Sequence, residues 1–247
     1  MVSKIILFAN EKGGIAKSTS VFNVGVALSS RGKTVLLVDT DYHAGLTHIS
    51  GLDPLAYGKC SAAMIQPFGV PASDCVLQLR GKLFIITSRP EISAVADSVK
   101  SNTVLRDVLS PIRDDYDYIL LDCPQSGVLM RNALACSDYV IIPIETDNLA
   151  RKSAASFEAT VHQSEINDNP GLKILGAIAT KYKSRIKDDN IILHLLQERY
   201  DIIAVIKNLA IGKKGVYDGL AVEEIDPKND ISVAYGEIAD YIIRKAV

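Results

Sequence analysis

The sequence has no marked excess of either charge. Its 27 lysines and arginines nearly balance 29 aspartates and glutamates, which gives a net charge of −2 at pH 7. This balance argues against a protein that binds nucleic acid with its whole surface. Contact with phosphate backbones would have to come from local basic patches, or from two copies of a patch in a dimer.

Long apolar runs are also missing. No apolar segment approaches the roughly 20 residues that a membrane-spanning helix needs. The N-terminal stretch MVSKIILFAN has too short an apolar run for a signal peptide, and it leads straight into a glycine loop. We therefore expect a soluble, cytoplasmic protein without a membrane partner.

Patterns typical of redox or metal sites are absent as well. Cys60, Cys75, Cys123 and Cys136 form no C-x-x-C pair. We interpret them as small, largely buried apolar residues in a reducing compartment; a disulfide or an iron–sulfur cluster is the alternative. The four histidines lack metal-ligand spacing, no Ser/His/Asp triad is visible, and His43 is expected at the surface.

Short apolar runs alternate with longer amphipathic stretches along the chain. Runs this continuous and rich in Ile, Leu and Val suit strands that are covered on both faces. The predicted strands are 4–10, 34–40, 83–88, 117–123, 138–144, 173–180 and, more weakly, 202–206. The predicted helices are 17–30, 91–99, 102–112, 127–136, 149–166, 188–198 and 229–245.

This alternation predicts the α/β class, with a doubly wound, mostly parallel sheet flanked by helices. No linker, repeat or low-complexity tract divides the chain, so residues 1–247 are expected to form a single domain. The stretch 51–80 has no clear period, and we interpret it as a short helical insertion.

The segment KIILFANEKGGIAKSTSVFN reads as a strand, a glycine turn and a helix. In this order, backbone N–H groups curl around an anion and the helix N-terminus presents its dipole. Gly13 and Gly14 allow close approach of the backbone. Lys17 would supply charge for the β- and γ-phosphates, and the Ser18 hydroxyl is placed to ligate Mg²⁺. The alternative is a plain strand–helix turn with incidental lysines.

Two positions depart from the standard phosphate-loop pattern G-x-x-x-x-G-K-[ST]. Glu11 and Ala16 stand where glycines are expected. If residue 16 needs a positive φ, alanine costs on the order of 1 kcal/mol; if it takes ordinary angles, the methyl only crowds the loop. Neither case removes the contacts of Lys17 or Ser18, so we expect nucleotide binding to survive, with slow hydrolysis.

Acidic side chains follow two of the predicted strands. Asp39 and Asp41 come at the carboxyl end of the second strand, where α/β sheets gather ligand groups, and the D-x-D spacing puts both on one side of an extended chain. Asp122 ends the buried run DYILLD, in the arrangement that holds Mg²⁺ in phosphate-loop enzymes. Solvated turn aspartates, or a helix cap at Asp122, are the alternatives.

The box KGGIAKST resembles the deviant Walker A box of the ParA/MinD family of ATPases, usually K-G-G-x-G-K-[ST]-[ST]. The resemblance extends over most of the chain and is weakest at 51–80 and 181–205. It implies a Mg-dependent ATPase in which Lys12 reaches across a homodimer to the nucleotide of the other subunit. The nucleotide-binding residues that it implies are Lys12, Gly13, Gly14, Ile15, Ala16, Lys17, Ser18 and Thr19.

The same resemblance assigns roles to the acidic residues. Asp41 would orient or activate the attacking water, with Lys12 and Lys17 as the other catalytic groups. Ser18, Asp39 and Asp122 would lie around the Mg²⁺. The segment CPQSG resembles the γ-phosphate-sensing CPPS switch, whereas the Tyr-His pair after Asp41 replaces the Pro-Gln of the family pattern.

Members of this family act as ATP-timed switches. The resemblance implies an ATP-bound dimer that binds DNA nonspecifically on the nucleoid, with a ParB-like partner that stimulates hydrolysis during plasmid or chromosome partition. Positioning of a protein cargo such as carboxysomes is the alternative. Lys213 and Lys214 are the favoured DNA contacts among three basic clusters; the other two are Arg151 with Lys152, and the group Lys181, Lys183, Arg185 and Lys187.

Three other classes remain as rivals. A MinD-like membrane ATPase would end in a basic amphipathic helix, whereas ISVAYGEIADYIIRKAV carries two acids and reads as a packing helix. An iron–sulfur reductase relative would need paired cysteines at a dimer face. A purely structural role with an inactive nucleotide site is suggested only by Ala16.

Overall fold

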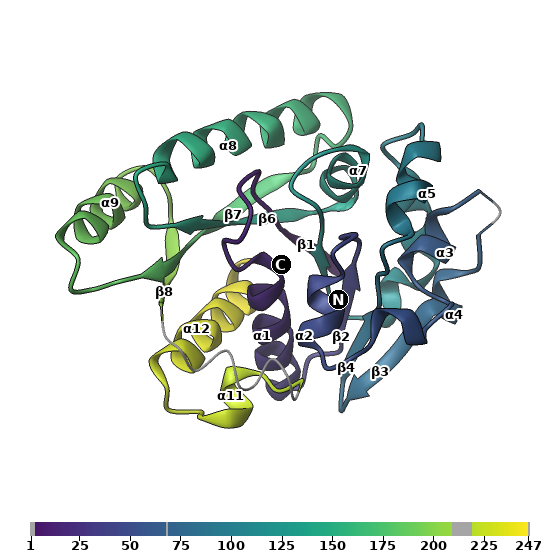
Figure 1. The fold of residues 1–247 in the computed structure, drawn as a ribbon, viewed down its shortest axis with the longest axis horizontal. Helices are drawn as coiled ribbons and strands as arrows, with labels where there is room; N and C mark the ends of the chain where they lie inside the picture. The colour runs from purple at the N-terminus through teal and green to yellow at the C-terminus, as the bar shows by residue number, and fades with distance from the viewer. Residues whose placement is uncertain (1–2, 68, 209–218, 247) are drawn as a thin grey trace.

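The computed structural model describes residues 3–67, 69–208 and 219–246. In the described part of the chain, eight strands form one sheet in the order β3-β4-β2-β5-β1-β6-β7-β8 (Figure 1). All neighbouring strands are parallel except β3, which pairs antiparallel with β4. The strands are β1 (Lys4–Phe8), β2 (Val35–Asp39), β3 (Val76–Arg80), β4 (Leu83–Ile86), β5 (Tyr118–Asp122), β6 (Tyr139–Glu145), β7 (Lys173–Tyr182) and β8 (Ile202–Lys207).

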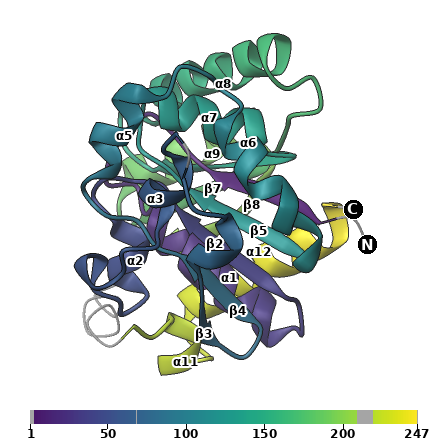
Figure 2. The ribbon, with the colours of Figure 1, turned by 90° about the vertical axis from the view of Figure 1, so that its right-hand side faces the viewer.

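Helices cover both faces of the sheet. In Figures 1 and 2, α1, α11 and α12 lie on one face, and α7 and α8 lie on the other. The helices are α1 (Lys17–Ser30), α2 (Gly45–Ile49), α3 (Ser61–Ile65), α4 (Ala72–Cys75), α5 (Ile92–Ser98), α6 (Val104–Leu109), α7 (Val128–Cys136), α8 (Ala150–Asn167), α9 (Lys187–Gln197), α11 (Val222–Ile225) and α12 (Asp230–Lys245), with 3-10 turns η1 (Pro54–Ala56) and η2 (Ser110–Asp115).

The two faces of the sheet explain the continuous apolar runs. Successive side chains of a strand point to opposite faces. In β1, Ile5 and Leu7 join the core under α7 and α8, whereas Ile6 and Phe8 join the core under α1 and α12. Both sets are buried because helices cover both faces. The predicted doubly wound, mostly parallel α/β fold is therefore confirmed.

The stretch 51–80 differs from the predicted helical insertion. It contains η1, α3 and α4, but it ends in the strand β3, which was not predicted. Strand β3 forms a hairpin with β4 around Gly81, which has a φ of 48°. Its VLQLR sequence is short and only half-buried at an edge of the sheet, so it lacks the continuous apolar signal of the central strands.

Smaller differences concern the helices, among them the unpredicted α11. The predicted helix at 102–112 divides into α6 and the 3-10 turn η2, because Pro111 lacks the N–H that a continuing α-helix would use. The five-residue helix α2, directly after the D-x-D segment, was not predicted.

The C-terminal helix α12 packs into the core, as expected. Its apolar residues Ile238 and Ile242 are fully buried in the core that α12 shares with α1. No helix in residues 3–67, 69–208 and 219–246 is long and apolar enough to cross a membrane. All four cysteines are free and buried, which confirms their interpretation as small core residues.

The strand register brings the predicted acidic residues together. Strand β5 lies between β1 and β2, and Asp122 pairs in register with Phe8 on one side and with Asp39 on the other. The glycine loop follows Phe8 directly. The two acids and the loop therefore meet at the carboxyl edge of the sheet.

Candidate functional site

The glycine loop connects β1 to α1 through two residues with left-handed backbone angles. Gly14 has a φ of 68°, and Ala16 has a φ of 67° with a ψ of 31°. The carbonyl of Ala16 accepts a hydrogen bond from the Ser20 N–H at 2.9 Å, so α1 begins directly after it. Of the two cases left open by the sequence, the structure selects the one in which alanine occupies a position that favours glycine.

Gly13 lies against the Gln125 side chain. A Cβ atom on Gly13 would lie 2.5 Å from Nε2 of Gln125, so a side chain there would make the flexible end of Gln125 move. Gln125 was not predicted as a site residue. The signal was present, since Gln125 belongs to the quoted CPQSG segment, but only the fold places this segment against the loop.

A cavity of about 400 Å³ lies over the loop and the start of α1. It is lined by Gly14, Ile15, Ala16, Lys17, Ser18, Thr19, Asp41, His43, Gly45, Gln125 and Lys181. A larger, mainly apolar cavity of about 570 Å³ beside α3 and α6 includes none of the predicted site residues. The smaller cavity therefore brings together most of the predicted nucleotide-binding residues.

Asp122, close to Ser18 of the cavity wall, is in an electrostatically unfavourable position. Its side chain is fully buried, and neither carboxylate oxygen makes a hydrogen bond, although the Ser18 hydroxyl lies close enough to lower its pKa. Burial and the neighbouring Asp39 carboxylate outweigh Ser18 and Lys17 and raise the pKa of Asp122 well above its ordinary value. An orphaned, buried carboxylate beside a hydroxyl fits a Mg²⁺ ion, which would satisfy it.

Asp39 is also buried, but its oxygens are occupied. It accepts hydrogen bonds from the Asp41 N–H at 3.0 Å and from the N–H and hydroxyl of Thr47, both at 2.8 Å. Burial nevertheless raises the pKa of Asp39, despite these bonds. In this structure Asp39 shapes the loop between β2 and α2. It lies beside Asp122 in the neighbouring strand. Its carboxylate already accepts three hydrogen bonds, so it has little free capacity to bind a metal directly.

Asp41 is the acid that faces the cavity. Its backbone is fixed by Asp39, and one of its carboxylate oxygens accepts the His43 N–H at 2.9 Å. His43 is exposed, as expected, and it also lines the cavity. Asp41 thus lies at the cavity wall although Tyr-His replaces the Pro-Gln of the family pattern.

Lys17 and Ser18 stand at the first turn of α1 and face the same cavity. Lys17 is only 8% exposed, so its charge acts at short range in a poorly solvated place. Within the described residues, no three His, Cys, Asp or Glu side chains cluster to hold a metal. Mg²⁺ commonly uses only one or two carboxylates and takes its other ligands from phosphates and water.

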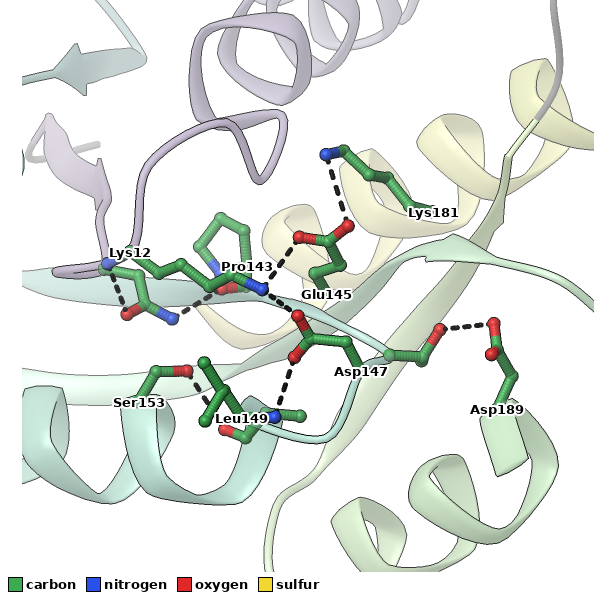
Figure 3. Close-up of polar contacts among 11 residues, drawn as sticks. Lys12, Pro143, Glu145, Asp147, Leu149, Ser153, Lys181 and Asp189 are labelled. Carbon is green, nitrogen blue, oxygen red and sulfur yellow. Dashed lines mark hydrogen bonds and ion pairs between the residues drawn. The ribbon is translucent and has the colours of Figure 1, made fainter.

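Lys12 does not project freely from the molecule. Its Nζ donates hydrogen bonds to Oε2 of Glu145 at 2.9 Å and to Oδ2 of Asp147 (Figure 3). Lys181 pairs with the other oxygen of Glu145 at 3.3 Å. Sequence reasoning missed Glu145 and Asp147 as partners of Lys12, because they lie more than 130 residues from it and carry no motif.

The predicted DNA contacts, Lys213 and Lys214, lie outside the described residues. Among the other basic residues that the sequence singled out, Lys183, Arg185 and Lys187 are exposed. Lys181 instead faces the cavity and Glu145.

The parallel sheet, the glycine loop and the two strand-end acids define a nucleotide-binding protein of the phosphate-loop class. Residues 3–174 match the family model described as an AAA domain (AAA_31). The chain belongs to this family, and its relatives include ParA and Soj partitioning ATPases. The resemblance seen in the sequence is thereby confirmed.

Individual comparisons agree. The chromosome-partitioning ATPase Soj of Treponema pallidum is 33% identical over 193 residues, which cover 75% of this chain and 74% of that protein. The chromosome partitioning protein ParA of Myxococcus xanthus is 31% identical over 191 residues, covering 74% and 67%. The crystal structure of cobyrinic acid a,c-diamide synthase from Mycobacterium smegmatis, with bound ADP and magnesium, has a TM-score of 0.84 at 28% identity and covers 98% of this chain and 94% of that one.

The left-handed angles of Ala16 predict that glycine is more stable there. We expect Ala16→Gly to raise the free energy of unfolding by about 0.5–1 kcal/mol, and Tm by roughly 2–3 °C, because strain at a positive φ is relieved. Thermal unfolding of the nucleotide-free protein measures this. Ala159→Gly, at an exposed position inside α8, is the control and should lower stability by up to about 1 kcal/mol. A loss of stability in both variants would contradict strain at Ala16.

Because the Asp122 carboxylate has no hydrogen-bond partner, we predict that replacing it raises the free energy of unfolding, and that the increase depends on pH. The folded state raises the pKa of Asp122, so the nucleotide-free protein loses stability as pH rises above the ordinary aspartate pKa, and Asp122→Asn does not. The variant should therefore exceed wild type in the free energy of unfolding by more at pH 8 than at pH 5, by at least about 1 kcal/mol.

Chemical denaturation at both pH values measures the difference, and added Mg·ATP should stabilise Asp122→Asn less than wild type. Asp97→Asn removes an exposed carboxylate on α5, outside the cavity, and should show neither effect. A pH-independent difference for Asp122→Asn would contradict the raised pKa.

Proposed function

We propose that this chain is a Mg-dependent ATPase switch of the ParA type, with slow hydrolysis that a partner protein stimulates. One observation carries the proposal: Lys17, Ser18 and Asp41 line a single cavity, and the buried, unsatisfied Asp122 lies close to the Ser18 hydroxyl. Loop amides and Lys17 would bind the β- and γ-phosphates, Asp122 and Ser18 would hold Mg²⁺, and Asp41 would orient the attacking water.

The bound groups follow from the same site. ATP fits a loop whose amides and Lys17 suit a polyphosphate, and the Mycobacterium smegmatis relative binds ADP and magnesium in a similar fold. Bound Mg²⁺ would neutralise Asp122 and the phosphates. We also propose that residues 1–247 act as one domain, since β7 and β8 extend the sheet that begins with β1.

The ATP-bound form would be a homodimer in which Lys12 contacts the partner's nucleotide. It would bind DNA nonspecifically and, with a ParB-like partner, partition plasmid or chromosome DNA, in line with the names of Soj and ParA relatives. The same switch positioning a protein cargo is the second candidate. Recovering the protein that binds only the ATP state distinguishes the two. A MinD-like role is less favoured, because the apolar residues of α12 are buried in the core.

The proposed role of Lys12 predicts that its removal weakens dimerisation much more than nucleotide binding. With a non-hydrolysed ATP analogue and Mg²⁺, wild type should convert from monomer to dimer, whereas Lys12→Ala should stay mostly monomeric and bind nucleotide within about twofold of wild type. Light scattering and nucleotide titration measure the two quantities. Lys59→Ala, which loses an exposed ion pair with Asp74, is the control. Equal dimer yields from wild type and Lys12→Ala would contradict a cross-subunit role.

The position of Asp41 predicts a loss of chemistry without a loss of binding. Asp41→Ala should lower phosphate release from ATP by at least about tenfold, since an unoriented water attacks poorly, while Mg·ATP affinity stays within a few-fold. Phosphate release is measured with and without DNA, and Asp97→Ala serves as the matched carboxylate control. An unchanged rate in Asp41→Ala would place the water-activating group elsewhere.

A further inference from the structure

Lys12 is bound within its own chain by two carboxylates from one short segment. Glu145 ends β6, and Asp147 lies in the turn before α8. Both accept hydrogen bonds from the single ammonium of Lys12, whose side chain is 23% exposed (Figure 3). The ammonium is therefore directed back at its own chain.

The backbone around Lys12 is held at the same place. The Asn10 amide donates to the Pro143 carbonyl at 2.9 Å, and the Lys12 N–H donates to the Asn10 side chain at 3.3 Å. On the other side, Glu11 accepts hydrogen bonds from the Ser156 and Thr160 hydroxyls of α8 at 2.7 and 2.6 Å. These contacts fix the start of the loop, so the long side chain of Lys12 is the part that can move.

The charges of this cluster are mutually satisfied. Burial alone would lower the pKa of Lys12, but the hydrogen bonds from Lys12 to Asp147 and Glu145 outweigh it and raise that pKa. Glu145 also receives Lys181, and the two lysines outweigh burial and lower the pKa of Glu145. Two ammonium groups thus face two carboxylates. A lysine so neutralised attracts a phosphate weakly, because the carboxylates oppose the phosphate charge.

We propose that Glu145 and Asp147 form an autoinhibitory latch that holds Lys12 in the monomer and has to be broken in both chains before the dimer forms. This inference rests on the proposed function, in which Lys12 contacts the partner's nucleotide. The latch opposes dimerisation at low ATP, and the charge of a bound triphosphate in the partner competes with the two carboxylates for the ammonium. Dimerisation therefore has a threshold that the nucleotide must overcome.

Asp147 offers the cleaner substitution. Its second oxygen accepts the Leu149 N–H at 3.1 Å at the start of α8, and an asparagine keeps an oxygen for this bond while losing the charge. Glu145 is less suitable, since its removal also leaves Lys181 without its partner.

The experiment measures the dimer dissociation constant by sedimentation equilibrium, with saturating non-hydrolysed ATP analogue and Mg²⁺. We expect Asp147→Asn to dimerise roughly tenfold more tightly than wild type. Each partly exposed ion pair accounts for about threefold, and one pair is removed in each of the two chains of the dimer. Asp240→Asn, which removes the ion pair with Arg31 between α1 and α12, is the control and should leave the constant unchanged. The Lys12→Ala background is measured at protein concentrations high enough to populate its weaker dimer. Asp147→Asn should have no effect there, because the latch is already absent.

The outcomes separate the latch from the proposed function. If wild type dimerises and Asp147→Asn dimerises equally or less tightly, the latch is wrong and the switch stands. An effect of Asp147→Asn that persists in the Lys12→Ala background also overturns the latch. If neither wild type nor Asp147→Asn dimerises at any concentration, the switch and the latch both fail. Dimerisation by Asp147→Asn alone would support the latch in its strongest form.

Discussion

The register of three parallel strands is the constraint on which the site depends. Pairing of β5 with both β1 and β2 sets Asp122 beside Asp39 and beside the start of the glycine loop. The strands are covered on both faces, so both acids are fully buried. The apolar runs that build the sheet therefore also bury two carboxylates, whose negative charge is unfavourable there unless a cation binds beside them.

The unfavourable burial of these two carboxylates links folding stability to ligand binding. Burial and the Asp39 carboxylate in the adjacent strand raise the pKa of Asp122, and burial together with Asp41 raises the pKa of Asp39. Asp39 compensates through Thr47 and the backbone, whereas Asp122 has no hydrogen bond. The nucleotide-free protein thus carries a local destabilisation that either a bound cation or protonation of Asp122 would relieve. Ligand binding and folding stability are coupled through this one side chain.

The sequence predicts what local pattern controls and misses what the fold alone brings together. Central strands and long helices follow from apolar periodicity, and Lys17, Ser18 and Asp122 follow from their places at element ends. The edge strand β3 was missed because half-burial weakens its pattern. The backbone angles of Ala16 could not be predicted, since the same residues are compatible with either conformation. Glu145 and Asp147 were missed, and Lys181 was assigned only to a basic cluster, because ion pairs between distant segments leave no spacing to read. Gln125 lies in the quoted CPQSG segment, but only the fold places that segment against the loop.

Lys12 shows why the missed contacts matter. The sequence motif indicates that Lys12 is available to another subunit. In the structure, Lys12 already forms ion pairs with Glu145 and Asp147 of its own chain. The two descriptions fit together if the free energy of the intrachain ion pairs is part of the dimerisation equilibrium. Partly exposed pairs are individually weak, so they shift this equilibrium without blocking it. A weak, reversible contact suits a protein that alternates between monomer and dimer, because a strong one would fix a single state.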